Sequence, residues 1–284
     1  MKILVIGGGG REHALVWKLK NGDAAREIFC APGNPGIAEI AECVPLQVKQ
    51  IIELADFAED NKIDLSVVGP EDPLTDGIVD LFEKRNLPVF GPNRQSALLE
   101  GSKAYAKKVM ERFNVPTAEY CEFDDFEKAL AYVKTQGVPI VIKADGLAAG
   151  KGVTVAETLA EAETALRSIM VQKVFGESGT KVVIEECLRG EEMTVLAFVD
   201  GKTVLPMVPS QDHKPVFDSD RGPNTGGMGA YSPVPQLEKW LPEINERVLR
   251  PVAEGLAEEG TPFSGILYAG LMITENGPKV IEFN

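Results

Sequence analysis

The chain has few of the residues that build covalent catalytic sites. It has two histidines, His13 and His213, and neither lies in a nucleophile motif such as Gly-x-Ser-x-Gly. Its four cysteines are scattered and show no Cys-x-x-Cys spacing, so they predict neither a disulfide framework nor a redox pair. Catalysis through a serine or cysteine nucleophile is therefore not expected, and the scattered thiols indicate a reducing, cytoplasmic environment.

Long apolar runs are also missing from the sequence. No segment approaches the roughly 20 apolar residues that are needed to cross a bilayer. The first apolar stretch, residues 3–6, is too short for a signal peptide and lacks a cleavage site. We therefore expect a cytoplasmic protein that has no membrane partner.

Basic residues are in deficit. There are 29 lysines and arginines against 43 acidic residues, and the net charge is −14. Nucleic-acid binders depend on a basic surface that neutralises phosphates, so nucleic acid is not expected as a partner. An acidic chain can still hold a local anion site, and nucleotides therefore remain candidate ligands.

The order of strand-like and helix-like stretches predicts two domains. Over residues 1–100 short apolar strands alternate with helices, which is typical of an α/β domain with a Rossmann-like parallel sheet. From about residue 101 to 284 this alternation gives way to helices and paired strands, which predicts an α+β domain. Ligands of a parallel sheet bind at the carboxyl ends of its strands, where the glycine-rich loops lie.

Local signals predict several individual elements. Ser102 is expected to cap a helix that ends near Phe113. Residues 69–73 are expected to form a loop, and the proline- and glycine-rich residues 209–235 a long ordered loop. One long helix is expected around residues 237–259, followed by two strands.

Four consecutive glycines at 7–10 separate the first strand from a helix. A dinucleotide fingerprint also needs a third glycine, where this chain has Glu12 or His13, and an acid about 20 residues further on, which is missing. NAD binding and an oxidoreductase are therefore disfavoured. Two interpretations stay open: backbone N–H groups at the helix start bind a phosphate, or the glycines form a tight turn without a ligand.

A second glycine-rich segment, residues 146–152, nearly matches a Walker A loop. It has three residues between its first two glycines instead of four, and Gly152 replaces the hydroxyl residue that would bind magnesium. Lys143 on the preceding strand and Lys151 inside the segment could instead neutralise a polyphosphate. A lysine on a buried strand is costly without an anionic partner. The alternative is that Lys143 lies on an exposed edge strand.

Side chains with carboxylate or amide oxygens lie at the ends of two predicted strands. The segment 183–192 carries acids at both ends of a short hinge, and exposed hairpin charges would explain them equally well. Glu282 and Asn284 lie two residues apart, hence on one face of a strand. Their oxygens are of the kind that magnesium prefers, although such a pair is common by chance.

In this order, these motifs resemble those of the ATP-grasp ligases, and among them the glycinamide ribonucleotide synthetase family. The closer resemblance is carried by residues 7–15, 31–34, 69–74, 211–214 and 222–233. It extends from residue 1 to 284, and the last stretch is long enough to be highly specific. Pro215 departs from the pattern, because the family usually has a basic residue there.

The resemblance implies a fold and a reaction. The fold is a Rossmann-like domain at 1–100 followed by an ATP-grasp domain at 101–284, in which about 122–190 form a mobile lid. The reaction joins glycine to 5-phosphoribosylamine in de novo purine biosynthesis, through glycyl phosphate. ATP is the co-substrate, Mg²⁺ or Mn²⁺ the metal, and the enzyme is expected to be a monomer.

The resemblance also assigns residues to roles. ATP contacts are expected from Lys103, Lys143, Lys151, Glu185, Glu186, Leu188 and Glu192. Substrate contacts are expected from Gly9, Gly10, Arg11, Glu12, Glu71, Asp212, Thr225, Gly226, Gly227, Met228 and Gly229. Lys143 and Asp212 are expected to take part in catalysis, and Glu282 and Asn284 to hold the metal.

Two alternatives remain beside this prediction. The first alternative is another ATP-grasp carboxylate–amine ligase, which would share the ATP-binding lysines and the strand that carries Glu282 and Asn284. The specific stretch 222–233 argues against it. The family continues past the position of Asn284 into a C-terminal domain, so the chain is expected to be truncated there. A nucleotide-binding fragment without catalytic activity is therefore the second alternative.

Overall fold

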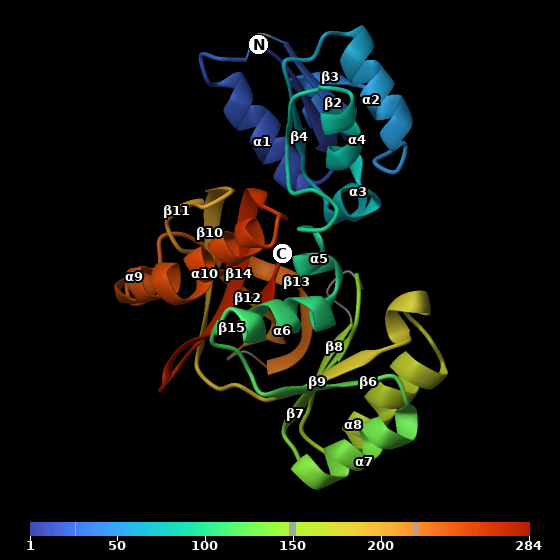
Figure 1. Ribbon diagram of the computed structural model, residues 1–284, viewed down its shortest axis with the longest axis vertical. Coiled ribbons are helices and arrows are strands. Elements are labelled where there is room, and N and C mark those ends of the chain that lie inside the picture. Colours follow the sequence, from blue (N-terminus) through green and yellow to red (C-terminus); the bar gives the residue numbers. More distant parts are fainter. Residues whose placement is uncertain (26, 148–151, 219–220) are drawn as a thin grey trace. The chain divides into compact units, whose positions relative to one another are not determined.

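The computed structural model of the protein describes residues 1–25, 27–147, 152–218 and 221–284 (Figure 1). The chain divides into two compact units. The N-terminal unit comprises residues 1–97 with 263–266, and the C-terminal unit comprises 98–262 with 267–284. None of the described helices is both long and apolar enough to span a membrane.

A five-stranded sheet in the order β3-β2-β1-β4-β5 forms the centre of the N-terminal unit. Every neighbouring pair is parallel, as the alternating pattern predicts. The strands are β1 (Lys2–Gly7), β2 (Glu27–Pro32), β3 (Glu42–Cys43), β4 (Leu65–Val68) and β5 (Val89–Phe90). β1 is in the middle of the sheet, and its residues 3–7 are all buried.

Helices cover this sheet. They are α1 (Gly10–Lys20), α2 (Ile51–Asp60), α3 (Glu71–Asp76) and α4 (Ile78–Lys84). The expectation that 69–73 form a loop is wrong in part, because α3 begins at Glu71. Pro73 is tolerated there because the first turn of a helix has backbone N–H groups without a helical partner in any case.

The C-terminal unit contains two four-stranded sheets and a hairpin. One sheet has the order β6-β9-β7-β8, formed by β6 (Tyr120–Phe123), β9 (Val182–Glu186), β7 (Ile140–Ala144) and β8 (Val153–Ala156). Helices α7 (Phe126–Gln136) and α8 (Leu159–Leu166) pack on one of its faces around a shared apolar core (Figure 1). The sequence did not predict β6 and β8.

The second sheet has the order β11-β10-β14-β15, formed by β10 (Glu191–Asp200), β11 (Thr203–Pro206), β14 (Ser264–Thr274) and β15 (Gly277–Phe283). The hairpin between β10 and β11 pairs Asp200 with Thr203, as its turn sequence predicts. α5 (Leu98–Gly101) and α6 (Lys103–Arg112) belong to the same unit.

Two expectations for the C-terminal unit are wrong. Residues 209–235 are not a loop, because β12 (Gln211–Phe217) and β13 (Arg221–Tyr231) pair as an antiparallel hairpin with register shifts. Both are edge strands of a two-stranded sheet, and edge strands tolerate proline, which has no backbone N–H to donate. The long helix is divided into a short 3₁₀ turn, α9 (Leu241–Ile244), a π-helical turn and α10 (Arg250–Glu258).

The core of the N-terminal unit gives a stability prediction. Phe82 on α4 is fully buried, so Phe82→Ala is expected to lower the free energy of unfolding of this unit by about 3–5 kcal/mol. Trp17→Ala is the control, because Trp17 is 58% exposed and a change of about 0.5 kcal/mol or less is expected. Urea denaturation would measure both, and equal losses would contradict the burial of Phe82.

Candidate functional site

The start of α6 is fastened to the loop that follows β7. Ser102 caps the helix as predicted, accepting a hydrogen bond from Tyr105 N at 3.1 Å. Its hydroxyl also donates to Asp145 Oδ1 at 3.0 Å, and Ala104 N donates to the same oxygen at 3.1 Å. Lys103 Nζ donates to Gly146 O at 3.0 Å. Two predicted site elements, the helix lysine and the glycine-rich segment, therefore lie together.

Lys143 and Glu185 meet across two neighbouring strands. In the antiparallel register of β7 and β9, Val141 lies opposite Glu185 and Lys143 opposite Val183. Lys143 and Glu185 are thus diagonal neighbours on one face, and Lys143 Nζ lies 3.0 Å from Glu185 Oε1. The opposite face carries the apolar residues that pack on α7 and α8. Strand alternation therefore turns these two charges away from the apolar core.

The charges of this group are almost completely buried. The exposed fractions of the side chains are 3% for Lys143 and 4% for Glu185. The edge-strand alternative for Lys143 is therefore wrong, because β7 lies between β9 and β8. Lys143 also donates to Ile281 O of β15 at 2.9 Å.

A second buried lysine joins the same carboxylate. Lys107 Nζ on α6 lies 3.2 Å from Glu185 Oε2, and 2% of the Lys107 side chain is exposed. Lys107 was not predicted as a site residue, although it lies four residues after Lys103 and so on the same face of the helix. Burial lowers the pKa of Lys107 to about 8, and the Glu185 charge opposes this shift.

Burial also lowers the pKa of Lys103, and the charge of Lys143 adds to the shift while that of Glu282 opposes it. Crowded ammonium groups in a poorly solvated place favour a ligand that brings negative charge. The pocket beside them is lined by Leu99, Glu100, Lys103, Ala106, Lys107, Met110, Lys143, Glu185, Ile281, Glu282, Phe283 and Asn284.

Glu282 and Asn284 line this pocket from the end of β15. Glu282 pairs with Gly270 of β14, and Asn284 exchanges backbone hydrogen bonds of 3.0 Å with Tyr268. The described residues contain no group of three or more acids, histidines or cysteines that could hold a metal ion. One carboxylate and one amide oxygen fit magnesium or manganese when phosphates and waters supply the other ligands.

Glu186, the last residue of β9, and Leu188 are two of the predicted ATP contacts. The Glu186 side chain accepts a hydrogen bond from Glu119 N at 3.1 Å and pairs with Lys279 at 2.8 Å. The hydrogen bond from Lys279 holds the pKa of Glu186 below its usual value, against the effect of burial. The side chain is thus engaged within the protein. Leu188 lies in the connection from β9 to β10.

Glu192 and Asp212 are held together by a lysine. Lys214 Nζ lies 2.7 Å from Glu192 Oε2 and 3.3 Å from Asp212 Oδ1. Burial lowers the pKa of Lys214, but the hydrogen bond and charge of Glu192 and the charge of Asp212 outweigh it, so the pKa is raised. Lys214 was missed as a site residue, although the resemblance includes residues 211–214.

The glycine-rich part of β13 lies beside this group. Thr225 Oγ1 donates to Lys214 O at 2.8 Å and accepts from Gly227 N at 3.1 Å. A Cβ atom at Gly226, Gly227 or Gly229 would meet nothing within 4 Å, and Met228 is 60% exposed. The predicted residues of this segment therefore lie beside β12, the strand that carries Asp212 and Lys214, and its three glycines have open space around them.

The glycine-rich loop of the N-terminal unit is closed by an internal carboxylate. Glu12 is 4% exposed, and its Oε2 accepts a hydrogen bond from Gly9 N at 2.7 Å. Arg11 Nη1 donates to Gly69 O at 2.6 Å. Glu12 therefore shapes the loop. Gly10 is the first residue of α1 and Glu71 the first residue of α3, and both follow the carboxyl ends of the adjacent strands β1 and β4.

Lys151, which was predicted to contact ATP, lies outside the described residues.

Lys103 of α6 and Lys143 of β7 line one pocket with Glu282 and Asn284 at the end of β15. Two lysines opposite a carboxylate and an amide, between two antiparallel sheets, are the arrangement of an ATP-grasp enzyme. Residues 101–284 match the family model described as the ATP-grasp (A) domain of phosphoribosylglycinamide synthetase, and residues 1–100 match the N domain of that enzyme. The chain belongs to the phosphoribosylglycinamide synthetase family, the phosphoribosylamine–glycine ligases.

Individual relatives agree with this membership. A curated phosphoribosylamine–glycine ligase from Halalkalibacterium halodurans is 54% identical over 285 residues, which cover 100% of this chain and 67% of the relative. One from Escherichia coli is 54% identical over 288 residues, with the same coverage. The crystal structure of the Thermotoga maritima ligase has 32% identity and a TM-score of 0.84, covering 100% of this chain and 68% of that one.

A more distant structure shares the fold alone. The biotin carboxylase from Campylobacter jejuni, solved as a complex with β,γ-ATP, has 18% identity and a TM-score of 0.77, covering 100% of this chain and 64% of that one. The predicted family, mixed α/β fold and ligase activity are confirmed. The oxidoreductase is excluded, and the roles of individual residues stay predictions.

The packing around Glu12 gives a prediction for the N-terminal loop. A Cβ atom at Gly69 would lie 2.1 Å from Glu12 Oε1. Gly69→Ala is therefore expected to lower the free energy of unfolding of the N-terminal unit by about 1–3 kcal/mol. Urea denaturation would measure it, with Gly10→Ala as control, because a Cβ there meets nothing within 4 Å. Equal midpoints for the two variants would contradict the close packing of Glu12.

Proposed function

We propose that this chain uses ATP to join glycine to 5-phosphoribosylamine through a glycyl phosphate intermediate. The observation that carries the proposal is the pocket of the C-terminal unit, in which Lys103 and Lys143 face Glu282 and Asn284. A carboxylate does not react with an amine in water unless it is first activated, and transfer of the ATP γ-phosphoryl group supplies this activation.

The first step is phosphoryl transfer to the glycine carboxylate, with ADP as leaving group. Such a transfer depends on positioning and on charge neutralisation rather than on a protein nucleophile. Lys103 and Lys143 neutralise phosphate oxygens, and Lys151 is predicted to do the same. Glu282 and Asn284 would hold Mg²⁺ or Mn²⁺, which would neutralise phosphate charge.

The adenosine lies along the connection from β9 to β10. Glu186 and Leu188 contact adenine through their backbones, which agrees with the engagement of the Glu186 side chain by Lys279 and Glu119. Glu192 receives the ribose hydroxyls. Glu185 does not touch the nucleotide in this proposal, because its carboxylate is enclosed by two lysines.

The second step is attack of the ribosylamine nitrogen on the carbonyl carbon of glycyl phosphate, which expels phosphate. Asp212 and the segment Thr225, Gly226, Gly227, Met228 and Gly229 line the glycine site, where a carboxylate can hold the glycine ammonium. Backbone groups of Gly9 and Gly10, with Arg11 and Glu71, receive the ribosylamine and its phosphate. Glu12 contributes by shaping that loop.

Water must be kept from the acyl phosphate, because hydrolysis would waste ATP. We propose that residues of about 122–190, which include β6, β9, β7 and β8, close over the nucleotide as a lid. We also propose that the enzyme works in the cytoplasm, which agrees with its four free cysteines. A monomeric state stays a prediction.

Release of ADP tests the reaction. The chain is incubated with magnesium, ATP, glycine and freshly formed phosphoribosylamine, and each component is left out in turn. ADP is expected only when both glycine and the ribosylamine are present. ATP binding without substrate-dependent ADP release would instead support the nucleotide-binding fragment.

The metal strand gives a second prediction. Glu282→Gln is expected to reduce turnover by on the order of 100-fold or more, because a neutral amide oxygen holds a divalent metal ion more weakly than a carboxylate does. Glu275→Gln, in the exposed turn before β15, is the matched control and should keep normal turnover. Near-normal turnover of Glu282→Gln with unchanged metal dependence would contradict the assignment.

A further inference from the structure

The carboxylate of Glu185 is shared by two ammonium groups that are held very differently. Lys107 lies 3.2 Å from Oε2 and Lys143 lies 3.0 Å from Oε1. All three side chains have exposed fractions of 4% or less. A buried charge without a partner is strongly unfavourable, so neither lysine can leave Glu185 unless the other one neutralises it.

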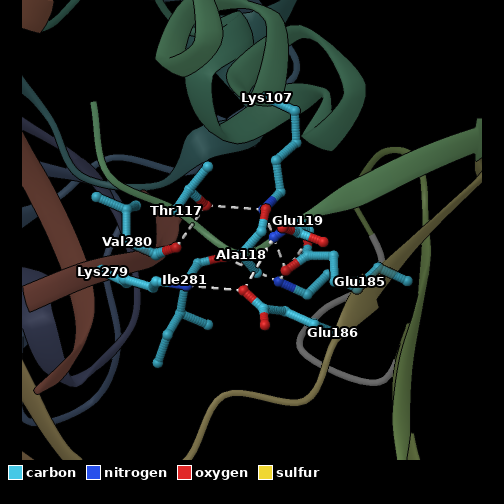
Figure 2. Close-up of polar contacts among 10 residues, drawn as sticks. Lys107, Thr117, Ala118, Glu119, Glu185, Glu186, Lys279, Val280 and Ile281 are labelled. Carbon is cyan, nitrogen blue, oxygen red and sulfur yellow. Dashed lines mark hydrogen bonds and ion pairs between the residues drawn. The ribbon is translucent and has the colours of Figure 1, made fainter. Parts of the chain in front are cut away.

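Lys107 is fixed in place by its other contacts. Its ammonium donates to Thr117 Oγ1 at 2.8 Å and to Ala118 O at 3.4 Å, and it lies 5.3 Å from the centre of the Tyr120 ring. Figure 2 shows the side chain extending from α6 towards Thr117 and Glu185. With Glu185 as the third acceptor, all three protons of the ammonium have a partner in the protein.

Thr117, which accepts a hydrogen bond from Lys107, is itself hydrogen-bonded to β15, the strand that carries Glu282. Thr117 Oγ1 donates to Val280 O of β15 at 2.7 Å (Figure 2). Val280 N in turn donates to Pro116 O at 2.8 Å. The position of Lys107 is therefore determined by α6 and by the strand that carries Glu282.

Lys143 is held less completely. Among the residues that the structure describes, its ammonium has Ile281 O at 2.9 Å and the ion pair with Glu185 Oε1 as partners. That oxygen of Glu185 accepts no hydrogen bond from the described residues, so the contact is an unaligned ion pair. Lys143 lines the pocket, and a proton is left for a ligand there.

We propose that Lys107 is a positioning residue that keeps Glu185 neutralised, so that Lys143 can exchange Glu185 for a phosphate oxygen of the nucleotide. In the empty site Glu185 holds Lys143 near its working place, and in the nucleotide complex Lys107 alone compensates Glu185. The inference rests on the proposed function, because it takes a nucleoside triphosphate as the ligand of Lys143.

Calorimetric titration with MgATP, without glycine or ribosylamine, tests the exchange. In Lys107→Met, Lys143 becomes the only partner of a buried carboxylate. The dissociation constant for MgATP is therefore expected to rise roughly 10- to 100-fold, which corresponds to the loss of one hydrogen bond to a charged group. Adding Glu185→Gln to Lys107→Met removes the charge that retains Lys143, and this double variant is expected to regain most of the lost affinity.

The recovery separates positioning from a purely structural role, because loss of packing at Lys107 would not be repaired by a change at Glu185. Lys108→Met is the matched control, since Lys108 is the next residue of α6 and pairs on the surface with Glu122 at 3.1 Å. It should bind MgATP as the wild type does. Circular dichroism of each variant verifies folding.

Two results would overturn the inference. One is an unchanged dissociation constant for folded Lys107→Met, and the other is a double variant that binds no better than Lys107→Met. In both, MgATP binding by the wild type would leave the proposed function intact. A wild-type protein that did not bind MgATP would instead contradict the proposed function and the inference together.

Discussion

The C-terminal unit depends on the neutralisation of one buried carboxylate, Glu185, by two lysines. A charge enclosed to this degree is tolerated only when charged partners replace the lost water. Its partners come from a helix and from a neighbouring strand, and Lys143 also reaches the backbone of β15. The interaction therefore determines how α6, β7, β9 and β15 pack on one another. Without it, the three buried charges would have no compatible arrangement.

The two charged groups of the C-terminal unit, one around Lys103 and Lys143 and the other around Lys214, differ in their electrostatic surroundings. Around one pocket lie Lys103, Lys107 and Lys143, and burial lowers the pKa of Lys103. Around Lys214 two carboxylates outweigh one ammonium, and the pKa of that lysine is raised. An anionic triphosphate fits the first environment, whereas the hydroxyls of a sugar and the ammonium of an amino acid fit the second.

Much of this arrangement follows from the sequence, although not all of it. Alternation along β7 and β9 predicts which side chains share a face, so Lys143 could be recognised as a buried lysine that needs an anion. Ser102 identified the start of α6, because capping chemistry is local. Lys107 could not be recognised, since a lysine four residues along an amphipathic helix resembles any solvated lysine until Glu185 and Thr117 are brought to it by tertiary packing. The β12–β13 hairpin was missed for another reason: prolines and glycines indicate a loop, and only the pairing of these two neighbouring strands with each other overrides that signal.

The outermost strands of the N-terminal sheet, β3 and β5, have two residues each. Such short edges expose few backbone donors and acceptors in the row that an incoming strand would need. The long, apolar β1, whose sequence would pair readily with another copy of itself, is flanked on both sides by β2 and β4. The shortness of these edge strands consequently protects the sheet against edge-to-edge aggregation, and the exposed Glu42 on β3 adds a charge at one edge.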